Sequence, residues 1–206
     1  MKIGIIGAGN VGSALADNWQ KKGHEILIGA RDINSSKTEK LISINSNIQV
    51  KSIEDTVKDS EVILIATPSK AVFEIANQIK DFVKDKILID AMNTIGAKPE
   101  GYSNTYEVLR SITKSENIVK CFNSTGAENM ANPNYGLNKL DMFMAGKNPN
   151  AKKIVRTLAL DAGFEECYDF GGDEQVQILE NFALVWINLC MKQGHGRNFG
   201  FKIIKR

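Results

Sequence analysis

The sequence lacks the features of a disulfide-bonded, metal-binding or membrane-spanning protein. Its 206 residues hold only three cysteines, Cys121, Cys167 and Cys190, which are widely spaced and form no C-x-x-C pair. An odd number at this spacing supports neither a disulfide framework nor a zinc site, and it predicts three reduced core thiols in a cytoplasmic protein. No stretch approaches the roughly 20 apolar residues of a membrane span. Glycines also interrupt the apolar start of the chain, so we expect neither a signal peptide nor a membrane partner.

A surplus of one charge is absent as well. Twenty-six Lys and Arg residues face 24 Asp and Glu residues, which leaves a formal net charge of +2. A nucleic-acid partner is not expected at this balance, because such proteins must neutralise many phosphates. With 43% hydrophobic and 24% charged residues, the composition is that of a globular protein. It excludes a disordered tail, a collagen-like repeat and a coiled-coil rod, and the length suits one domain, or a large domain with a small appendage.

Short apolar stretches alternate with amphipathic ones along the chain. We predict strands at residues 2–6, 25–29, 48–50, 61–66, 86–90, 118–122, 141–145 and 164–168. We predict helices at residues 11–22, 37–44, 52–58, 69–79, 106–113, 150–162 and 173–191. Short apolar strands separated by helices indicate a parallel sheet covered on both faces, an α/β fold of the doubly wound class. We place its core in residues 1–147 and a C-terminal strand and helix extension, packed on the same domain, in residues 148–206.

The turn after the first predicted strand has the spacing G-x-G-x-x-G, in Gly7-Ala8-Gly9-Asn10-Val11-Gly12. Gly7 permits a tight turn, Gly9 lets the backbone approach a pyrophosphate, and Gly12 lets the helix pack closely on the strand. The N–H groups at the start of the helix then point at the phosphates. The strand before this turn and the amphipathic helix after it favour a Rossmann dinucleotide-binding site over a glycine-rich turn without a ligand.

The end of the second predicted strand indicates which nucleotide binds. NAD-binding domains usually carry an acidic residue here, about 20 residues beyond the glycines, that holds the ribose 2′-hydroxyl. By strand register this position is Ala30, which cannot bond a hydroxyl, and Arg31 after it can pair with the 2′-phosphate of NADP. Ser35 adds a donor nearby. We therefore predict NADP(H), while Asp32, 20 residues after Gly12, keeps NAD open, and a solvated loop charge at Arg31 is the remaining alternative.

Three further segments follow strands at the edge of the sheet where ligands of such folds bind. They are Ala66-Thr67-Pro68, Met92-Asn93 and Asn123-Ser124-Thr125. We expect the first against the adenosine half of the cofactor and the second near the nicotinamide. The third is the candidate catalytic group, placed to touch the reacting rings. The alternative is that its side chains cap the loop that follows.

With these residues, the chain resembles the family of F420-dependent NADP reductases and their bacterial relatives over almost its whole length. The resemblance includes residues 3–12, Ile28-Gly29-Ala30-Arg31, where the family places its 2′-phosphate-binding residue, residues 66–68, residues 119–129 and the tail at 196–202. It implies a cytoplasmic oxidoreductase that transfers hydride between the nicotinamide C4 of NADP(H) and C5 of a deazaflavin, coenzyme F420. A flavin or another small acceptor is an alternative partner. The oxidoreductase domain of metalloreductases that reduce ferric and cupric ions looks similar too.

Two other functions stay open. A non-catalytic NADP(H)-binding module that senses redox state, or partners another protein, would use the same cofactor residues. An imine or 2-hydroxy acid reductase, related to pyrroline-carboxylate reductases, needs a proton donor such as a lysine, and we find only Lys98, in a proline-containing loop. Hydride transfer itself needs few proton-handling side chains, which agrees with the presence of only two histidines, His24 and His195. The apolar stripe of the last predicted helix, residues 176–190, is core or the surface of a homodimer.

Overall fold

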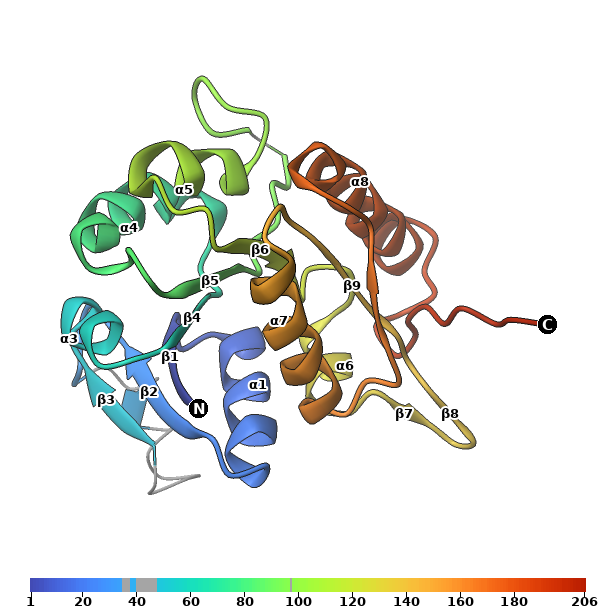
Figure 1. Ribbon diagram of the computed structural model, residues 1–206. Coiled ribbons are helices and arrows are strands. Elements are labelled where there is room, and N and C mark those ends of the chain that lie inside the picture. The colour runs from blue at the N-terminus through green and yellow to red at the C-terminus, as the bar shows by residue number, and fades with distance from the viewer. Residues whose placement is uncertain (35–37, 40–47, 97) are drawn as a thin grey trace.

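The computed structural model of the protein has a central sheet with helices on both faces (Figure 1). The structure describes residues 1–34, 38–39, 48–96 and 98–206. The strands of this sheet are β1 (Lys2–Ile6), β2 (Glu25–Gly29), β3 (Gln49–Lys51), β4 (Val62–Ile65), β5 (Ile87–Asp90), β6 (Ile118–Cys121), β9 (Met142–Ala145) and β10 (Cys167–Asp169). They lie in the order β10-β9-β6-β5-β4-β1-β2-β3. Strands β7 (Asn134–Tyr135) and β8 (Asn138–Lys139) form a separate hairpin.

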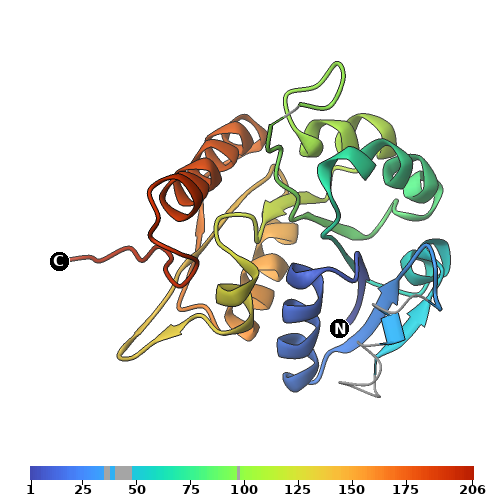
Figure 2. The same cartoon turned by 180° about the vertical axis from the view of Figure 1, so that it is seen from behind.

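Helices cover both faces of the sheet and bury two apolar cores against it (Figures 1 and 2). The helices are α1 (Asn10–Lys21), α3 (Ile53–Lys58), α4 (Val72–Ile79), α5 (Thr105–Thr113), α6 (Ala127–Ala131), α7 (Pro149–Asp161) and α8 (Val176–Ile187). Residues of α1, α6 and α7, such as Trp19, Met130 and Leu158, pack in one core. Residues of α3, α4, α5 and α8, such as Ile75 and Leu179, pack in the other. This arrangement confirms the predicted doubly wound α/β class.

The sheet is mostly, but not wholly, parallel. The six strands from β3 to β6 are mutually parallel. Strand β9 pairs antiparallel with β6, with Lys120 opposite Ala145, and β10 is parallel to β9. Between β6 and β9 the chain forms α6 and the β7–β8 hairpin, which the sequence pattern does not predict. After this segment, β9 runs alongside β6 in the opposite direction.

The C-terminal half differs from the prediction in detail. The strand predicted at 164–168 forms at Cys167–Asp169. The helix predicted at 173–191 begins with a 3-10 turn at Asp173–Gln175 and ends in a π-helical turn at Asn188–Lys192. The helix predicted at 37–44 lies, except for residues 38 and 39, outside the residues that the structure describes.

The three cysteines are all buried and free, as predicted. In the part of the chain that the structure describes, no helix has both the length and the apolar character needed to cross a bilayer. Strands β1, β2, β4, β5 and β6 run in one direction, so the loops that follow them meet at one edge of the sheet. From β1 the chain adds β2 and β3 on one side of β1 in the sheet, and it then adds β4, β5 and β6 on the opposite side of β1. Ligands of doubly wound folds bind at this kind of switch point.

Candidate nucleotide-binding site

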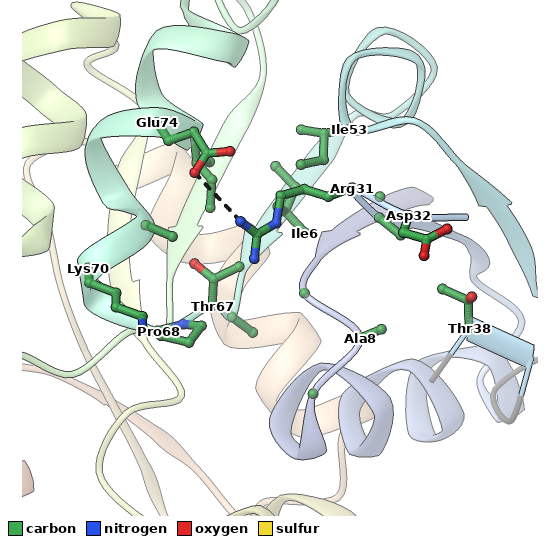
Figure 3. Close-up of a pocket in the computed structure, with 17 residues that line it drawn as sticks. Ile6, Ala8, Arg31, Asp32, Thr38, Ile53, Thr67, Pro68, Lys70 and Glu74 are labelled. Atoms are coloured by element: carbon green, nitrogen blue, oxygen red, sulfur yellow. Dashed lines mark ion pairs between the residues drawn. The ribbon is translucent and has the colours of Figure 1, made fainter. Parts of the chain in front are cut away.

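A cavity of about 590 Å³ lies at this switch point between the loops after β1, β2 and β4 (Figure 3). Its size is in the range of cavities that hold small molecules. The structure brings together at this cavity the following residues of the predicted cofactor site: Gly7, Ala8, Gly9, Ala30, Arg31, Asp32, Ala66, Thr67 and Pro68. Three segments that are far apart in the sequence therefore share one concave surface.

The glycines of the first turn differ in what surrounds them. Gly7 has a φ of +117°, and a Cβ there would lie 2.5 Å from the carbonyl oxygen of Ala66. A Cβ on Gly12 would collide with the carbonyl oxygen of Gly7, so both glycines allow close backbone packing. A Cβ on Gly9 would meet nothing within 4 Å. Gly9 therefore faces open space on the side where a bound group would approach the backbone.

The first turn of α1 leaves its N–H groups free of side-chain caps. Gly9 is the N-cap residue, no side chain accepts a hydrogen bond from this turn, and the turn holds no acidic residue. Asn10, Val11 and Gly12 belong to this turn and do not line the cavity. They can contribute only through their backbone and the helix dipole, which together favour an anion such as a phosphate.

Arg31 lies at the rim of the cavity, with a side chain that is 75% exposed. Its guanidinium is 3.7 Å from Glu74 Oε2, and Figure 3 shows the two side chains directed towards each other from the β2 loop and α4. Asp32 lies on the other side of the loop, where its Oδ1 accepts a hydrogen bond from the N–H of Asn34 at 3.0 Å. Ser35 lies outside the described residues.

Three polar residues of the cavity lining are missing from the sequence-based site, namely Thr38, Lys70 and Glu74. Lys70 and Glu74 do carry a signal in the sequence, because they stand four residues apart directly after Pro68. Lys70 lies in the 3-10 turn Ser69–Ala71 and Glu74 in α4, which continues it, and both side chains line the cavity. Thr38 follows a polar stretch without a clear pattern.

A second group of predicted residues meets beyond β5 and β6. Asn93 Nδ2 donates to the carbonyl oxygen of Asn123 at 2.9 Å, and Asn123 Nδ2 donates to Asn93 Oδ1 at 3.1 Å. The hydroxyl of Thr67, in the cavity lining, donates to the sulfur of Met92 at 3.5 Å, so this group adjoins the first one. Asn123 is 3% exposed, and its Oδ1 has no hydrogen-bond partner among the described residues.

The other two residues of the candidate catalytic group have partners within the protein. Ser124 is 1% exposed, and its hydroxyl lies 3.6 Å from the sulfur of Met142. Thr125 Oγ1 accepts a hydrogen bond from Asn129 at 2.8 Å. The backbone reaches Asn123 through Phe122, which has a φ of +60°. For a large side chain this conformation costs about 1–3 kcal/mol, and such strain is found most often at functional sites.

A buried ionic cluster lies beneath the loop that contains Met92 and Asn93. Its cation is Lys120, which is fully buried and pairs with Asp90 at 3.1 Å and with Glu180. Burial lowers the pKa of Lys120, but the two carboxylates outweigh burial and raise it above its ordinary value. Burial also raises the pKa of Asp90, against the opposing effect of the Lys120 charge. Lys120 is therefore a cation at neutral pH.

The comparisons with known proteins agree with this geometry. Residues 2–94 match the model of the family described as NADP oxidoreductase, coenzyme F420-dependent. The F420-dependent NADP reductase of Methanothermobacter thermautotrophicus is 26% identical over an alignment of 223 positions, which covers 98% of this chain and 94% of that protein. The chain is similar to F420-dependent NADP reductases over nearly its whole length. The resemblance that the sequence motifs indicate is thus confirmed, and the chain stands among the NADP-linked oxidoreductases.

The chain is also similar to a second class of dehydrogenase in sequence and to a solved structure in fold. The glycerol-3-phosphate dehydrogenase [NAD(P)+] of Leuconostoc citreum is 25% identical over an alignment of 225 positions, which covers all of this chain but only 65% of that protein. The crystal structure of a candidate F420-dependent NADP reductase from Arthrobacter sp. FB24 superposes with a TM-score of 0.88 at 24% identity, over the full length of both chains. This likeness shows that the two chains share one fold.

Proposed function

We propose that the protein is an NADP(H)-dependent oxidoreductase that transfers hydride between NADPH and coenzyme F420, a flavin or another small acceptor. One observation carries the nucleotide part of this proposal. Gly9, which is the N-cap of α1 and has open space beside it, and Arg31 both line one cavity. A dinucleotide with a 2′-phosphate presents anions to both of these places.

The residues present fit such a nucleotide. The N–H groups at the start of α1 would hold the pyrophosphate, and Arg31 with Lys70 would hold the 2′-phosphate. Thr67 and Pro68 would lie against the adenosine half. When bound, the nicotinamide ring supplies or accepts the hydride, and the protein has to bind, orient and shield the rings. Asn123 is our candidate for the residue nearest the nicotinamide.

The acceptor is proposed from the family relationship. Relatives named F420-dependent NADP reductase match nearly the whole chain, which supports F420 before a flavin or a ferric or cupric ion. The structures of imine reductases and pyrroline-5-carboxylate reductases share only the fold, at 11–16% identity. Lys98, the lysine available to such a reductase as a proton donor, is exposed in the loop between β5 and α5.

We also propose that the protein works as a cytoplasmic homodimer. The three buried free cysteines support a reducing compartment. Support for a dimer comes from α8 and the turn after it, where Ile178, Leu184, Val185 and Met191 are 45–69% exposed. Large apolar side chains clustered on one helix are a common feature of interfaces.

The test combines binding with turnover. Isothermal titration calorimetry with NADPH and NADH should show binding, with a preference for NADPH. Oxidation of NADPH is then followed with F420, FMN and a ferric chelate in turn, and we expect turnover with F420. Tight NADPH binding without turnover by any acceptor would support the redox sensor instead, and a lack of binding by either nucleotide would refute the proposal.

A further inference from the structure

The ionic cluster of Lys120, Asp90 and Glu180 holds the loop of residues 92–94 from below. Lys120 Nζ donates to the carbonyl oxygen of Met92 at 2.6 Å. Asp90 Oδ1 accepts from the N–H of Met92 at 3.0 Å. Glu180 Oε2 accepts from the N–H of Thr94 at 3.2 Å. The backbone on both sides of Asn93 is therefore fixed by three buried charged groups.

These groups come from three elements that are distant in the sequence. Asp90 ends β5, Lys120 lies opposite it in β6, and Glu180 belongs to α8. Thr105, at the start of α5, donates its hydroxyl proton to Asp90 at 2.7 Å and accepts from Lys120 at 3.3 Å. Figure 1 shows α5 next to β6 and α8 next to β9. The cluster thus ties the C-terminal helix to the edge of the sheet.

Asn93, on the loop of residues 92–94, pairs with Asn123, and this pair leaves one side-chain acceptor unused. Asn93 and Asn123 bond to each other in both directions between their loops. This leaves Asn123 Oδ1 as a buried acceptor without a partner among the described residues. The hydroxyl of Thr94, the residue after Asn93, is likewise buried and unpartnered there. A buried acceptor of this kind is costly unless a ligand donor completes it, and a primary carboxamide is such a donor.

We propose that Asn123 Oδ1 accepts a hydrogen bond from the carboxamide N–H of nicotinamide, and that the cluster of Lys120, Asp90 and Glu180 positions Asn123 for this contact through Asn93. The proposal rests on the proposed binding of a nicotinamide nucleotide. Asn123 is then a binding residue, and the cluster is a set of positioning residues that does not touch the nucleotide. The charged groups of the cluster make directional hydrogen bonds to the backbone of Met92 and Thr94, and apolar side chains in their place could not make such bonds.

The test uses two ligands that differ in one donor. NADP⁺ carries the carboxamide, and its 3-acetylpyridine analogue has a methyl ketone in place of that amide. The wild-type protein should bind NADP⁺ about fivefold to tenfold more tightly than the analogue, the size expected for one hydrogen bond. Asn123→Ala should abolish this preference, and Glu180→Gln should reduce it by at least half. Binding of 2′,5′-ADP, which lacks nicotinamide, should stay unchanged in both variants.

A second variant and a control guard against simple loss of stability. Thr105→Val leaves the three charged groups in place, removes the two hydrogen bonds of the Thr105 hydroxyl to Asp90 and Lys120, and should also reduce the preference. Tyr106→Phe removes a hydroxyl on the neighbouring residue that donates to Asp173 at 2.5 Å and to the Ile118 carbonyl oxygen at 3.3 Å rather than to the cluster, and it should leave the preference intact. Because the preference is a ratio measured on the folded protein, a uniform loss of stability does not change it.

The outcomes separate this inference from the proposed function. If the wild-type protein binds neither nucleotide, the proposed function fails. If it binds NADP⁺ and the analogue equally, or if Asn123→Ala keeps the preference, the contact at Asn123 is refuted while nucleotide binding stands. If Asn123→Ala loses the preference but Glu180→Gln and Thr105→Val keep it, the positioning role of the cluster is refuted.

Discussion

Replacing Arg31 with alanine tests how the protein distinguishes NADPH from NADH. A charge-assisted hydrogen bond to a phosphate contributes about 1.5–3 kcal/mol. Arg31 is 75% exposed, however, and has to leave Glu74, 3.7 Å away, to bind the phosphate. Exposed pairs of this kind contribute about 0–1 kcal/mol. We therefore expect Arg31→Ala to weaken NADPH by about 1–2 kcal/mol, or roughly fivefold to thirtyfold in Kd.

Calorimetry with both nucleotides measures this effect, and Glu74→Gln is the matched variant. NADH should bind Arg31→Ala as it binds the wild-type protein, since NADH has no 2′-phosphate. Glu74→Gln should strengthen NADPH binding by up to about 1 kcal/mol, because it removes the carboxylate that competes for the guanidinium. Equal losses for NADPH and NADH in Arg31→Ala would refute the assignment of Arg31. A loss of NADH binding alone in Asp32→Asn would support an NAD site instead.

Three further predictions follow from the glycines and from a buried tyrosine. Gly9→Val should keep the thermal midpoint of unfolding, because the space beside Gly9 is open in the free protein. It should abolish nucleotide binding in calorimetry, because the valine side chain would fill the space that the pyrophosphate needs. Retained affinity would show that the turn has only a structural role. Gly7→Ala should lower the free energy of unfolding by more than about 1 kcal/mol in urea titrations, since its φ is +117° and the new Cβ would press on Ala66, and an unchanged midpoint would contradict this. Burial, opposed by the Arg110 charge, raises the pKa of Tyr106 to about 12 from 10.0. The stability from its protonated hydroxyl is present below about pH 10 and is lost as the pH rises to about 12, so Tyr106→Phe should be less stable below pH 10 and lose less stability across that interval; parallel pH profiles of the two proteins would contradict this.

The elements of the fold that the sequence predicts well are those with local causes. Strands β1 and β2 have the predicted bounds, because a short apolar run that ends at glycine or at a turn defines both its ends. The direction of β9 has no such local cause. Its residues Met142–Ala145 are apolar throughout and would suit either direction. Only the length and path of the chain between β6 and β9 decide that it runs antiparallel.

The site divides in the same way. The glycine turn and Arg31 are predictable because each depends on its distance from one strand end. The position of Asn123 depends on Phe122, whose φ of +60° no residue type in this stretch would indicate. The partners of Lys120 are also beyond sequence reasoning. They lie on β5 and α8, and only the packed fold brings their carboxylates to one buried amine.

The burial of Lys120 is difficult to explain by stability alone. Buried ion pairs often contribute no more to stability than apolar residues of the same volume, because the charges lose their hydration. An apolar side chain at this position of β6 would fill the core, but it could not fix the direction of the Met92 carbonyl group. Glu180 would then have no cation to pair with, and the N–H of Thr94 would lose a positioned acceptor. What the ions add is therefore orientation of the 92–94 loop, at the edge of the sheet where the nicotinamide is expected.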